Sequence, residues 1–253
     1  MKPTVVVAGA FGEFGRAFVQ DAGEAGYEVV ALDLQRSIDT QPPLDGSGAS
    51  LTLPVDARDA SSVSEAFAVI EENVESVDAL VSFVGYMLVP PKAIDDVTDV
   101  EWADVLHGNL TTFFNLCRAG LPALRRGTGP SAIVAVSSGL AIDPIHGTGP
   151  YSAAKSGLHG LVKTLAVENA PKIRVNAVAP SAADTNFLQG GTGRDGSSHG
   201  REWFDAERYQ QTVPMDRLCE PRDVSDLVLF LLSNQASYIT GQIVHLNGGK
   251  RMP

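Results

Sequence analysis

The chain of 253 residues contains only two cysteines, Cys117 and Cys219. They have no paired spacing and no Cys/His cluster around them, so we expect neither a disulfide framework nor a metal site. A chain of this length buries well over half of its unfolded surface and needs no such support for its core. We therefore expect both cysteines to be small core residues in a reducing compartment.

Basic residues are also few, with 19 Lys and Arg against 30 Asp and Glu and a net charge of -11. Nucleic-acid binding draws on clustered Lys and Arg, and the pairs 125–126 and 250–251 are too short for that. No apolar run reaches the roughly 18 residues that a membrane span requires. A strand that starts directly after residues 1–3 leaves no room for a signal peptide. We expect a soluble, cytoplasmic protein that binds neither nucleic acid nor membrane.

Strand-like and helix-like segments alternate along the whole chain, which predicts one α/β domain over residues 1–253. Strands are expected at 5–8, 28–32, 50–55, 79–84, 132–136, 174–178 and 242–246, and helices at 13–25, 60–74, 100–124, 151–168 and 221–232. This order predicts a doubly wound, Rossmann-like parallel sheet with helices on both faces. Such sheets bind ligands beyond the carboxyl ends of their strands.

Gly9, Gly12 and Gly15 follow the first expected strand and open the first helix, with Phe14 between the last two. Glycine suits this place because the backbone must turn tightly and approach a pyrophosphate, while the helix N-terminus offers free N–H groups to the anion. An ordinary strand–helix turn is the alternative. The strand before, the helix after and an acid at the end of the next strand favour a dinucleotide site that includes all four residues.

That acid is Asp33, which could accept hydrogen bonds from the adenosine ribose and repel a 2′-phosphate. Arg36 could instead bind a 2′-phosphate. We predict NAD as the cofactor, with NADP as the alternative. Asp56 ends the third strand, where it could meet adenine or simply be an acid in a turn.

Tyr151 and Lys155 lie four residues apart on an expected helix and so share one face. A phenol has a pKa of about 10, and a nearby ammonium group lowers it, which suits general acid–base chemistry. Such a pair is common by chance. Two further polar residues strengthen the functional interpretation: Ser138, which lies 13 positions before Tyr151, and Asn109, which lies within the long helix.

With these residues the chain resembles the compact short-chain dehydrogenase/reductase family. The matching stretches are Asn109-Leu110-Thr111, Val136-Ser137-Ser138, Tyr151-Ser152-Ala153-Ala154-Lys155, Val175 to Pro180, Pro214 to Pro221, Tyr238 to Gln242 and Asn247-Gly248-Gly249. They cover nearly all of the chain except residues 186–212, and their number and order make the resemblance specific.

The resemblance implies that Tyr151 is the proton donor or acceptor and that Ser138 hydrogen-bonds the substrate oxygen. Lys155 would hold the cofactor ribose and lower the tyrosine pKa, while Asn109 would support a proton relay. Thr185 matches the residue that contacts the nicotinamide carboxamide. The resemblance also implies a homodimer or homotetramer, with the Asn109 and Tyr151 helices at one interface.

The chain departs from the family pattern at three places. Glu13 stands where compact members usually carry glycine, and we expect Arg16 to draw its carboxylate aside. Ser82-Phe83-Val84-Gly85 replaces the usual Asn-Asn-Ala-Gly, and Ser181 replaces the glycine after Pro180. Gly85 and Pro180 remain in the predicted cofactor site.

These residues predict an oxidoreductase that interconverts a secondary alcohol and a ketone. The alternative is a non-catalytic dinucleotide-binding regulator on the same fold, which would not need Tyr151 or Lys155. The glycine-rich stretch 186–212 is expected to be a flexible substrate loop. Trp203 and Phe204 would either close over substrate or anchor a short helix.

Three further side chains near the expected site also allow two interpretations each. Met87 and Leu88 would line the pocket or pack in the core. His146 could touch substrate, but we expect it to be a solvated loop residue.

Overall fold

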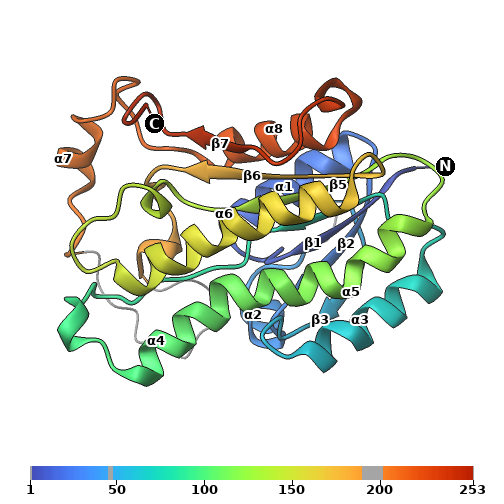
Figure 1. Ribbon diagram of the computed structural model, residues 1–253, viewed down its shortest axis with the longest axis horizontal. Helices are drawn as coiled ribbons and strands as arrows, with labels where there is room; N and C mark the ends of the chain where they lie inside the picture. Colours follow the sequence, from blue (N-terminus) through green and yellow to red (C-terminus); the bar gives the residue numbers. More distant parts are fainter. Residues whose placement is uncertain (1, 45–47, 190–201, 253) are drawn as a thin grey trace.

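The computed structural model describes residues 2–44, 48–189 and 202–252. Seven parallel strands form one sheet in the order β3-β2-β1-β4-β5-β6-β7 (Figure 1). The strands are β1 (Thr4–Ala8), β2 (Glu28–Asp33), β3 (Ala49–Pro54), β4 (Ala79–Ser82), β5 (Ser131–Val136), β6 (Ile173–Pro180) and β7 (Ile243–Leu246). The predicted doubly wound parallel sheet is confirmed.

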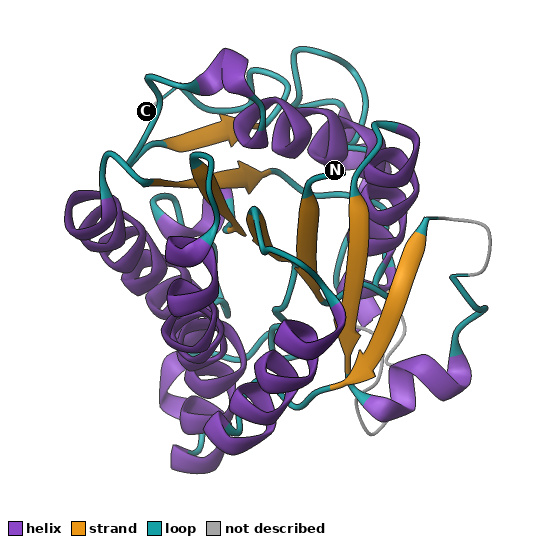
Figure 2. Ribbon diagram, turned by 90° about the vertical axis from the view of Figure 1, so that its right-hand side faces the viewer, coloured by secondary structure: helices purple, strands orange, loops and turns teal. Residues whose placement is uncertain are grey.

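Helices cover both faces of the sheet because its strands are apolar on both sides, as buried parallel strands are. Along β1, Val5 and Val7 belong to one core cluster, and Val6 and Ala8 belong to the other. The first cluster packs against α1 (Glu13–Glu24) and α8 (Pro221–Leu232). The second packs against α3 (Ala60–Asn73), α5 (Thr112–Arg126) and α6 (Gly149–Asn169) (Figure 2).

The strand order reverses between β1 and β4, which are neighbours in the sheet although two strands separate them in sequence. Connections leave this point toward opposite edges of the sheet, so a crevice opens beyond the carboxyl ends of the two strands. Most of the predicted cofactor residues come from the loops and strand ends around this crevice, whereas Tyr151 and Lys155 lie in the first turns of α6.

The long helix predicted over 100–124 consists of three parts. It starts as α4 (Asp99–Leu106), where Thr98 and Glu101 form a reciprocal capping box. A π-helical turn over His107–Thr111 follows, and the chain then continues as α5. Single π-turns within helices are frequent at functional sites. This one contains Asn109, which is completely buried.

Other boundaries also differ from those predicted. β4 ends at Ser82, two residues early, so that Phe83 and Val84 leave the sheet and line a cavity. The short helix α2 (Gln35–Thr40) has no side-chain cap and was missed.

The stretch 186–212, predicted to be an irregular flexible loop, holds a 3-10 helix at Asn186–Gln189 and the short helix α7 (Ala206–Gln210). Residues 190–201 of that loop lie outside the described residues. The remaining 3-10 helices are η1 (Ile94–Asp96), η3 (Gly139–Ala141) and η5 (Asn234–Ala236). Among the helices described, none combines the length and the apolar character that crossing a membrane would require.

Candidate active site

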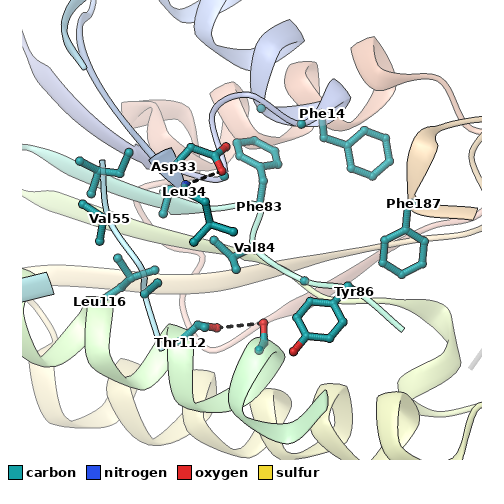
Figure 3. Close-up of a pocket in the computed structure, with 18 of the residues that line it drawn as sticks. Phe14, Asp33, Leu34, Val55, Phe83, Val84, Tyr86, Thr112, Leu116 and Phe187 are labelled. Carbon is teal, nitrogen blue, oxygen red and sulfur yellow. Dashed lines mark hydrogen bonds between the residues drawn. The ribbon is translucent and has the colours of Figure 1, made fainter. Parts of the chain in front are cut away.

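A cavity of about 370 Å³ lies at the carboxyl ends of β1, β2, β3 and β4. Eight of the predicted cofactor residues line it: Gly9, Gly12, Phe14, Gly15, Asp33, Asp56, Gly85 and Thr185. Figure 3 shows Leu34, Val55 and Leu116 toward one end and Phe14 and Phe187 toward the other. The cavity is therefore elongated, with an aliphatic end beside Asp33 and an aromatic end.

The glycine loop requires glycine at two of its positions. Gly9 has a φ of 78°, which L side chains rarely adopt, and an added Cβ would lie 3.1 Å from the Phe83 carbonyl carbon. A Cβ on Gly15 would lie 2.1 Å from the carbonyl oxygen of Gly9. Helix α1 starts after Gly12 without a side-chain cap. The loop thus fits a pyrophosphate, because no Cβ crowds its tight turn and no side chain caps the first N–H groups.

Asp33 is held by two backbone hydrogen bonds. The Phe11 N–H donates to Oδ2 and the Leu34 N–H to Oδ1, each at 2.8 Å. Burial raises the pKa of the Asp33 carboxyl group, and both of these hydrogen bonds oppose that rise. Each carboxylate oxygen keeps a second lone pair with which to accept a hydroxyl group. Arg36 is not among the described residues that line the cavity.

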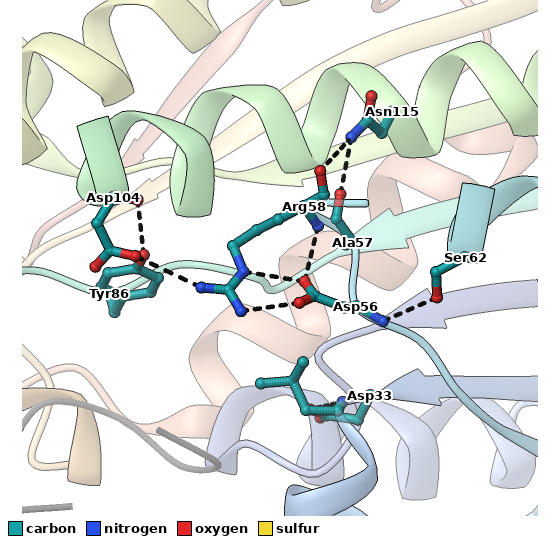
Figure 4. A network of polar contacts seen from close by, with 9 residues as sticks. Asp33, Asp56, Ala57, Arg58, Ser62, Tyr86, Asp104 and Asn115 are labelled. Atoms are coloured by element: carbon teal, nitrogen blue, oxygen red, sulfur yellow. Dashed lines mark hydrogen bonds and ion pairs between the residues drawn. The ribbon is translucent and has the colours of Figure 1, made fainter. Parts of the chain in front are cut away.

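Asp56 is engaged by a residue that the sequence analysis did not single out. The Arg58 guanidinium donates from Nε to Asp56 Oδ1 at 3.0 Å and from Nη2 to Oδ2 at 2.8 Å (Figure 4). This pairing lowers the pKa of Asp56. Both residues line the cavity. A charged residue two positions after the predicted acid was the available signal.

A second cavity, of about 160 Å³, adjoins the first, because Phe14, Phe83, Gly85, Thr185 and Phe187 line both. Its lining includes the predicted catalytic residues Ser138, Tyr151 and Lys155 as well as Pro180. The Tyr151 hydroxyl is hydrogen-bonded to the side chain of Ser138. Two hydroxyl groups therefore lie together in the lining of the second cavity.

Burial dominates the electrostatics of Tyr151 and Lys155, which are 5 % and 2 % exposed. It raises the pKa of Tyr151, and the hydrogen bond with Ser138 opposes that rise. It lowers the pKa of Lys155 to about 7. The predicted lowering of the Tyr151 pKa by Lys155 is not seen in the protein alone. With a pKa of about 7, Lys155 carries its positive charge only in part at neutral pH, and desolvation disfavours the phenolate.

The Lys155 Nζ donates to the Val136 carbonyl oxygen at 2.9 Å and lies 5.7 Å from the centre of the Tyr151 ring. The Asn109 side chain donates to the carbonyl oxygens of Tyr86 and Val105, both at 2.8 Å. A Cβ on Gly85 would lie 2.7 Å from Asn109 Oδ1 and 2.9 Å from Lys155 Nζ. Glycine at position 85 thus lets the asparagine and the lysine approach the same backbone.

The expected pairing of Glu13 with Arg16 is wrong, because the structure gives both residues other partners. The Asn186 N–H donates to Glu13 Oε2 at 2.6 Å, which joins the glycine loop to the segment after β6. Arg16 donates to the carbonyl oxygens of Pro42 and Pro43. The partner of Glu13 lies 173 positions away, which no local sequence pattern could reveal.

Aromatic and aliphatic side chains close the second cavity. Phe187 packs on Tyr151 with a ring-centre separation of 5.5 Å, and the Trp203 Nε1 donates to the Leu188 carbonyl oxygen at 3.0 Å. Phe204 and Met87 also line this cavity. Sequence reasoning missed Phe187 because single aromatic residues in loops carry no pattern.

Three other expectations can be compared with the structure. His146 is not among the described lining residues, whereas His245 is. Cys117 and Cys219 are buried, as expected. The described residues contain no group of three or more potential metal ligands.

Comparisons with known proteins agree with this geometry. A sequence profile of the family described as "Enoyl-(Acyl carrier protein) reductase" matches residues 9–251. The chain is 30 % identical to the 3-oxoacyl-(acyl-carrier-protein) reductase FabG of Buchnera aphidicola, over 99 % of this chain and 98 % of that protein. It is 33 % identical to dehydrogenase/reductase SDR family member 4 of Sus scrofa, over 90 % of this chain and 79 % of that protein.

Solved structures are similar over nearly the whole chain. A short-chain dehydrogenase/reductase of Brucella melitensis, described as a glucose/ribitol dehydrogenase, aligns with a TM-score of 0.87 and 28 % identity, over 99 % of this chain and 97 % of that one. A 3-ketoacyl-(acyl-carrier-protein) reductase of the same organism, complexed with NADH, aligns with a TM-score of 0.85 and 25 % identity, over 99 % and 98 %. The full-length match in sequence and in fold means that this chain belongs to the short-chain dehydrogenase/reductase family of oxidoreductases.

Proposed function

We propose that the protein interconverts a secondary alcohol and a ketone by hydride transfer with a nicotinamide dinucleotide, NAD in preference to NADP. The observation that carries this proposal is the meeting of the Ser138 and Tyr151 hydroxyls inside an apolar cavity that adjoins the dinucleotide-sized one. A non-catalytic dinucleotide-binding regulator, the alternative, would not need these two hydroxyls at that place.

When bound, the nicotinamide would supply or accept the hydride. The chain's own residues act on the substrate oxygen. Ser138 and Tyr151 would both donate hydrogen bonds to a ketone oxygen, and Tyr151 would transfer its hydroxyl proton as that oxygen gains negative charge. In the reverse direction Tyr151 would accept the alcohol proton. Lys155, in its protonated form, would stabilise the Tyr151 phenolate. Asn109 holds the backbone near Lys155 through its hydrogen bond to the Tyr86 carbonyl oxygen.

The substrate class follows from the lining of the second cavity. Met87, Leu140, Phe187 and Trp203 surround the two hydroxyls with apolar surface, which favours a small or medium-sized apolar ketone over a highly charged one. The names of two similar proteins, a 3-oxoacyl reductase and a 3-ketoacyl reductase, refer to carbonyl reduction. This supports a C=O bond as the reacting group.

The preference for NAD rests on Asp33, which lines the cavity while Arg36 is not among the described lining residues. A 2′-phosphate beside this carboxylate would experience like-charge repulsion. The NADH complex of the 3-ketoacyl reductase supports the same choice. We further propose a cytoplasmic homodimer or homotetramer.

The test is a screen of alcohols and ketones that follows reduced nicotinamide absorbance with each cofactor, applied to the unmodified protein and to Tyr151→Phe. Turnover should fall by several orders of magnitude in this variant, because the proton carrier is lost while the ring packing remains. NADH binding should stay nearly unchanged. Tyr238→Phe, at a fully exposed tyrosine, is the control and should retain full activity. Retention of most activity by Tyr151→Phe would remove this residue from the mechanism.

A further inference from the structure

The aliphatic end of the cofactor cavity carries one charged network, formed by Asp56, Arg58 and Asp104. Arg58 uses Nε and Nη2 for the Asp56 carboxylate, and its Nη1 lies 3.5 Å from Asp104 Oδ1 in α4 (Figure 4). Each of the three guanidinium nitrogens thus has a carboxylate oxygen within 3.5 Å. The side chain is nevertheless 44 % exposed. The surface that remains open is therefore mainly the faces of the guanidinium and its aliphatic stem.

The backbone under this network is fixed from two sides. The buried Asn115 in α5 donates from Nδ2 to the carbonyl oxygens of Ala57 and Arg58, at 3.1 and 3.2 Å. The Asp56 N–H donates to Ser62 Oγ at 3.2 Å. Arg58 is also drawn to Asp104 across the gap between the loop after β3 and α4. Its guanidinium plane is thus held in place before any ligand arrives, so little side-chain entropy remains to be lost on binding.

These constraints restrict what Arg58 can bind. A phosphate group would have to compete with the two carboxylates for the N–H groups of Arg58. The network of one cation and two anions carries a net charge of -1, which does not attract an anion either. A guanidinium face, by contrast, stacks well on a flat π-system. The same cavity is lined by the aliphatic side chains Leu34, Val55 and Leu116, which suit an apolar ring.

We propose that Arg58 is a base-stacking residue of the cofactor site, with Asp56 and Asp104 as the residues that position its guanidinium plane against the adenine ring. The inference rests on the proposed binding of a dinucleotide. It assigns Asp56 a different role from a direct contact with adenine. Asp56 acts through Arg58, and the base is recognised by its face and not by its amino group.

The experiment measures dissociation constants by calorimetry for NADH, AMP and reduced nicotinamide mononucleotide. Arg58→Ala should raise the dissociation constants of NADH and AMP by about tenfold, as expected for the loss of one stacking contact. The dissociation constant of the mononucleotide should stay unchanged. Arg58→Lys should behave like Arg58→Ala, because lysine keeps the charge but has no plane. Arg222→Ala, at an exposed arginine in α8, is the control and should change none of these values.

The two roles of Asp56 are separated by a dinucleotide whose adenine is replaced by hypoxanthine, which lacks the amino group. Stacking on Arg58 tolerates this change, so the unmodified protein should bind it within about twofold of NADH. Asp56→Ala should weaken NADH in the parent but have no further effect in the Arg58→Ala background. The positioning role of Asp56 would be overturned if the unmodified protein lost as much affinity for the hypoxanthine analogue as Arg58→Ala loses for NADH.

The remaining outcomes distinguish this inference from the proposed function. Unchanged NADH affinity in Arg58→Ala, or equal weakening of the mononucleotide, overturns the inference and leaves the function in place. The expected pattern without any hydride transfer supports the inference and contradicts the function. A protein that binds neither NADH nor AMP contradicts both.

Discussion

Asp33 illustrates how a single carboxylate can serve both the fold and ligand choice. Because the Phe11 N–H binds it, the same group that would face the ribose also fixes the glycine loop. We predict that Asp33→Ala narrows the preference for NAD over NADP and lowers the melting temperature. Asp33→Asn should reduce the preference for NAD as much as Asp33→Ala does. Its melting temperature should fall less, since the amide oxygen still accepts a hydrogen bond. Dissociation constants for both cofactors and thermal unfolding test this. Tighter binding of NADP than of NAD by the unmodified protein would show that Arg36 dominates.

Lys155 makes a pH-dependent contribution to stability whose sign follows from its burial. Its pKa falls from 10.5 in the unfolded chain to about 7, so the unfolded chain binds more protons between these pH values. The free energy of unfolding is therefore unaffected by the ionisation of this residue above pH 10.5. It decreases as the pH falls toward 7, by about 1.4 kcal/mol for each pKa unit, because the buried amine resists protonation. The free energy of unfolding of Lys155→Met should accordingly exceed that of the parent most at pH 6 and least at pH 10. Urea unfolding at pH 6, 8 and 10 measures this difference. Lys163→Met, an exposed site on the same helix, should show no such trend, and a difference for Lys155→Met that does not vary with pH would contradict the prediction.

At the scale of elements, the first turn of α1 is joined to the segment after β6 through Glu13 and Asn186. A carboxylate at this helix end competes with a pyrophosphate, yet its hydrogen bond connects two walls of the cofactor cavity. Glu13→Gln removes the charge and keeps an acceptor, so we predict NADH binding a few-fold tighter than in the parent. Glu13→Ala removes both and should release NADH faster than Glu13→Gln does. Stopped-flow association and dissociation rates separate the two effects. Identical dissociation rates in both variants would mean that the hydrogen bond does not retain the cofactor.

The elements most accurately predicted from sequence were those bounded by local chemistry. Pro221 favours the first helical position, and the predicted helix 221–232 matches α8 at both ends. The π-turn was not predictable, because one extra residue hardly disturbs a helical periodicity of 3.6. The raised pKa of Tyr151 was also missed, because sequence spacing reveals neighbours but not burial. The ion pair of Arg58 with Asp104 required the tertiary structure, since the two residues lie on separate elements.

For the whole molecule, the outer surface of α4 and α5 bears on the question of assembly. Trp102 and Phe114 are large apolar side chains on these helices that are 39 % and 43 % exposed. The π-turn with Asn109 lies between the two helices, so contact with a second copy here would stiffen the backbone that supports Gly85 and Lys155. A two-fold interface pairs the same patch on both copies, so each substitution acts twice.

We therefore predict that the unmodified protein sediments as a dimer or tetramer and that Phe114→Asp shifts it toward smaller species. Activity should fall with the shift, because the support of the π-turn is lost along with the contact. Val69→Asp is the matched control: Val69 is similarly exposed, at 37 %, but lies on α3, so this change should alter neither mass nor activity. Sedimentation velocity at several concentrations, combined with turnover on the same samples, measures both effects. A monomeric parent would reject the assembly outright. A dissociated Phe114→Asp variant with full turnover would show that each chain holds its active site without help from a partner.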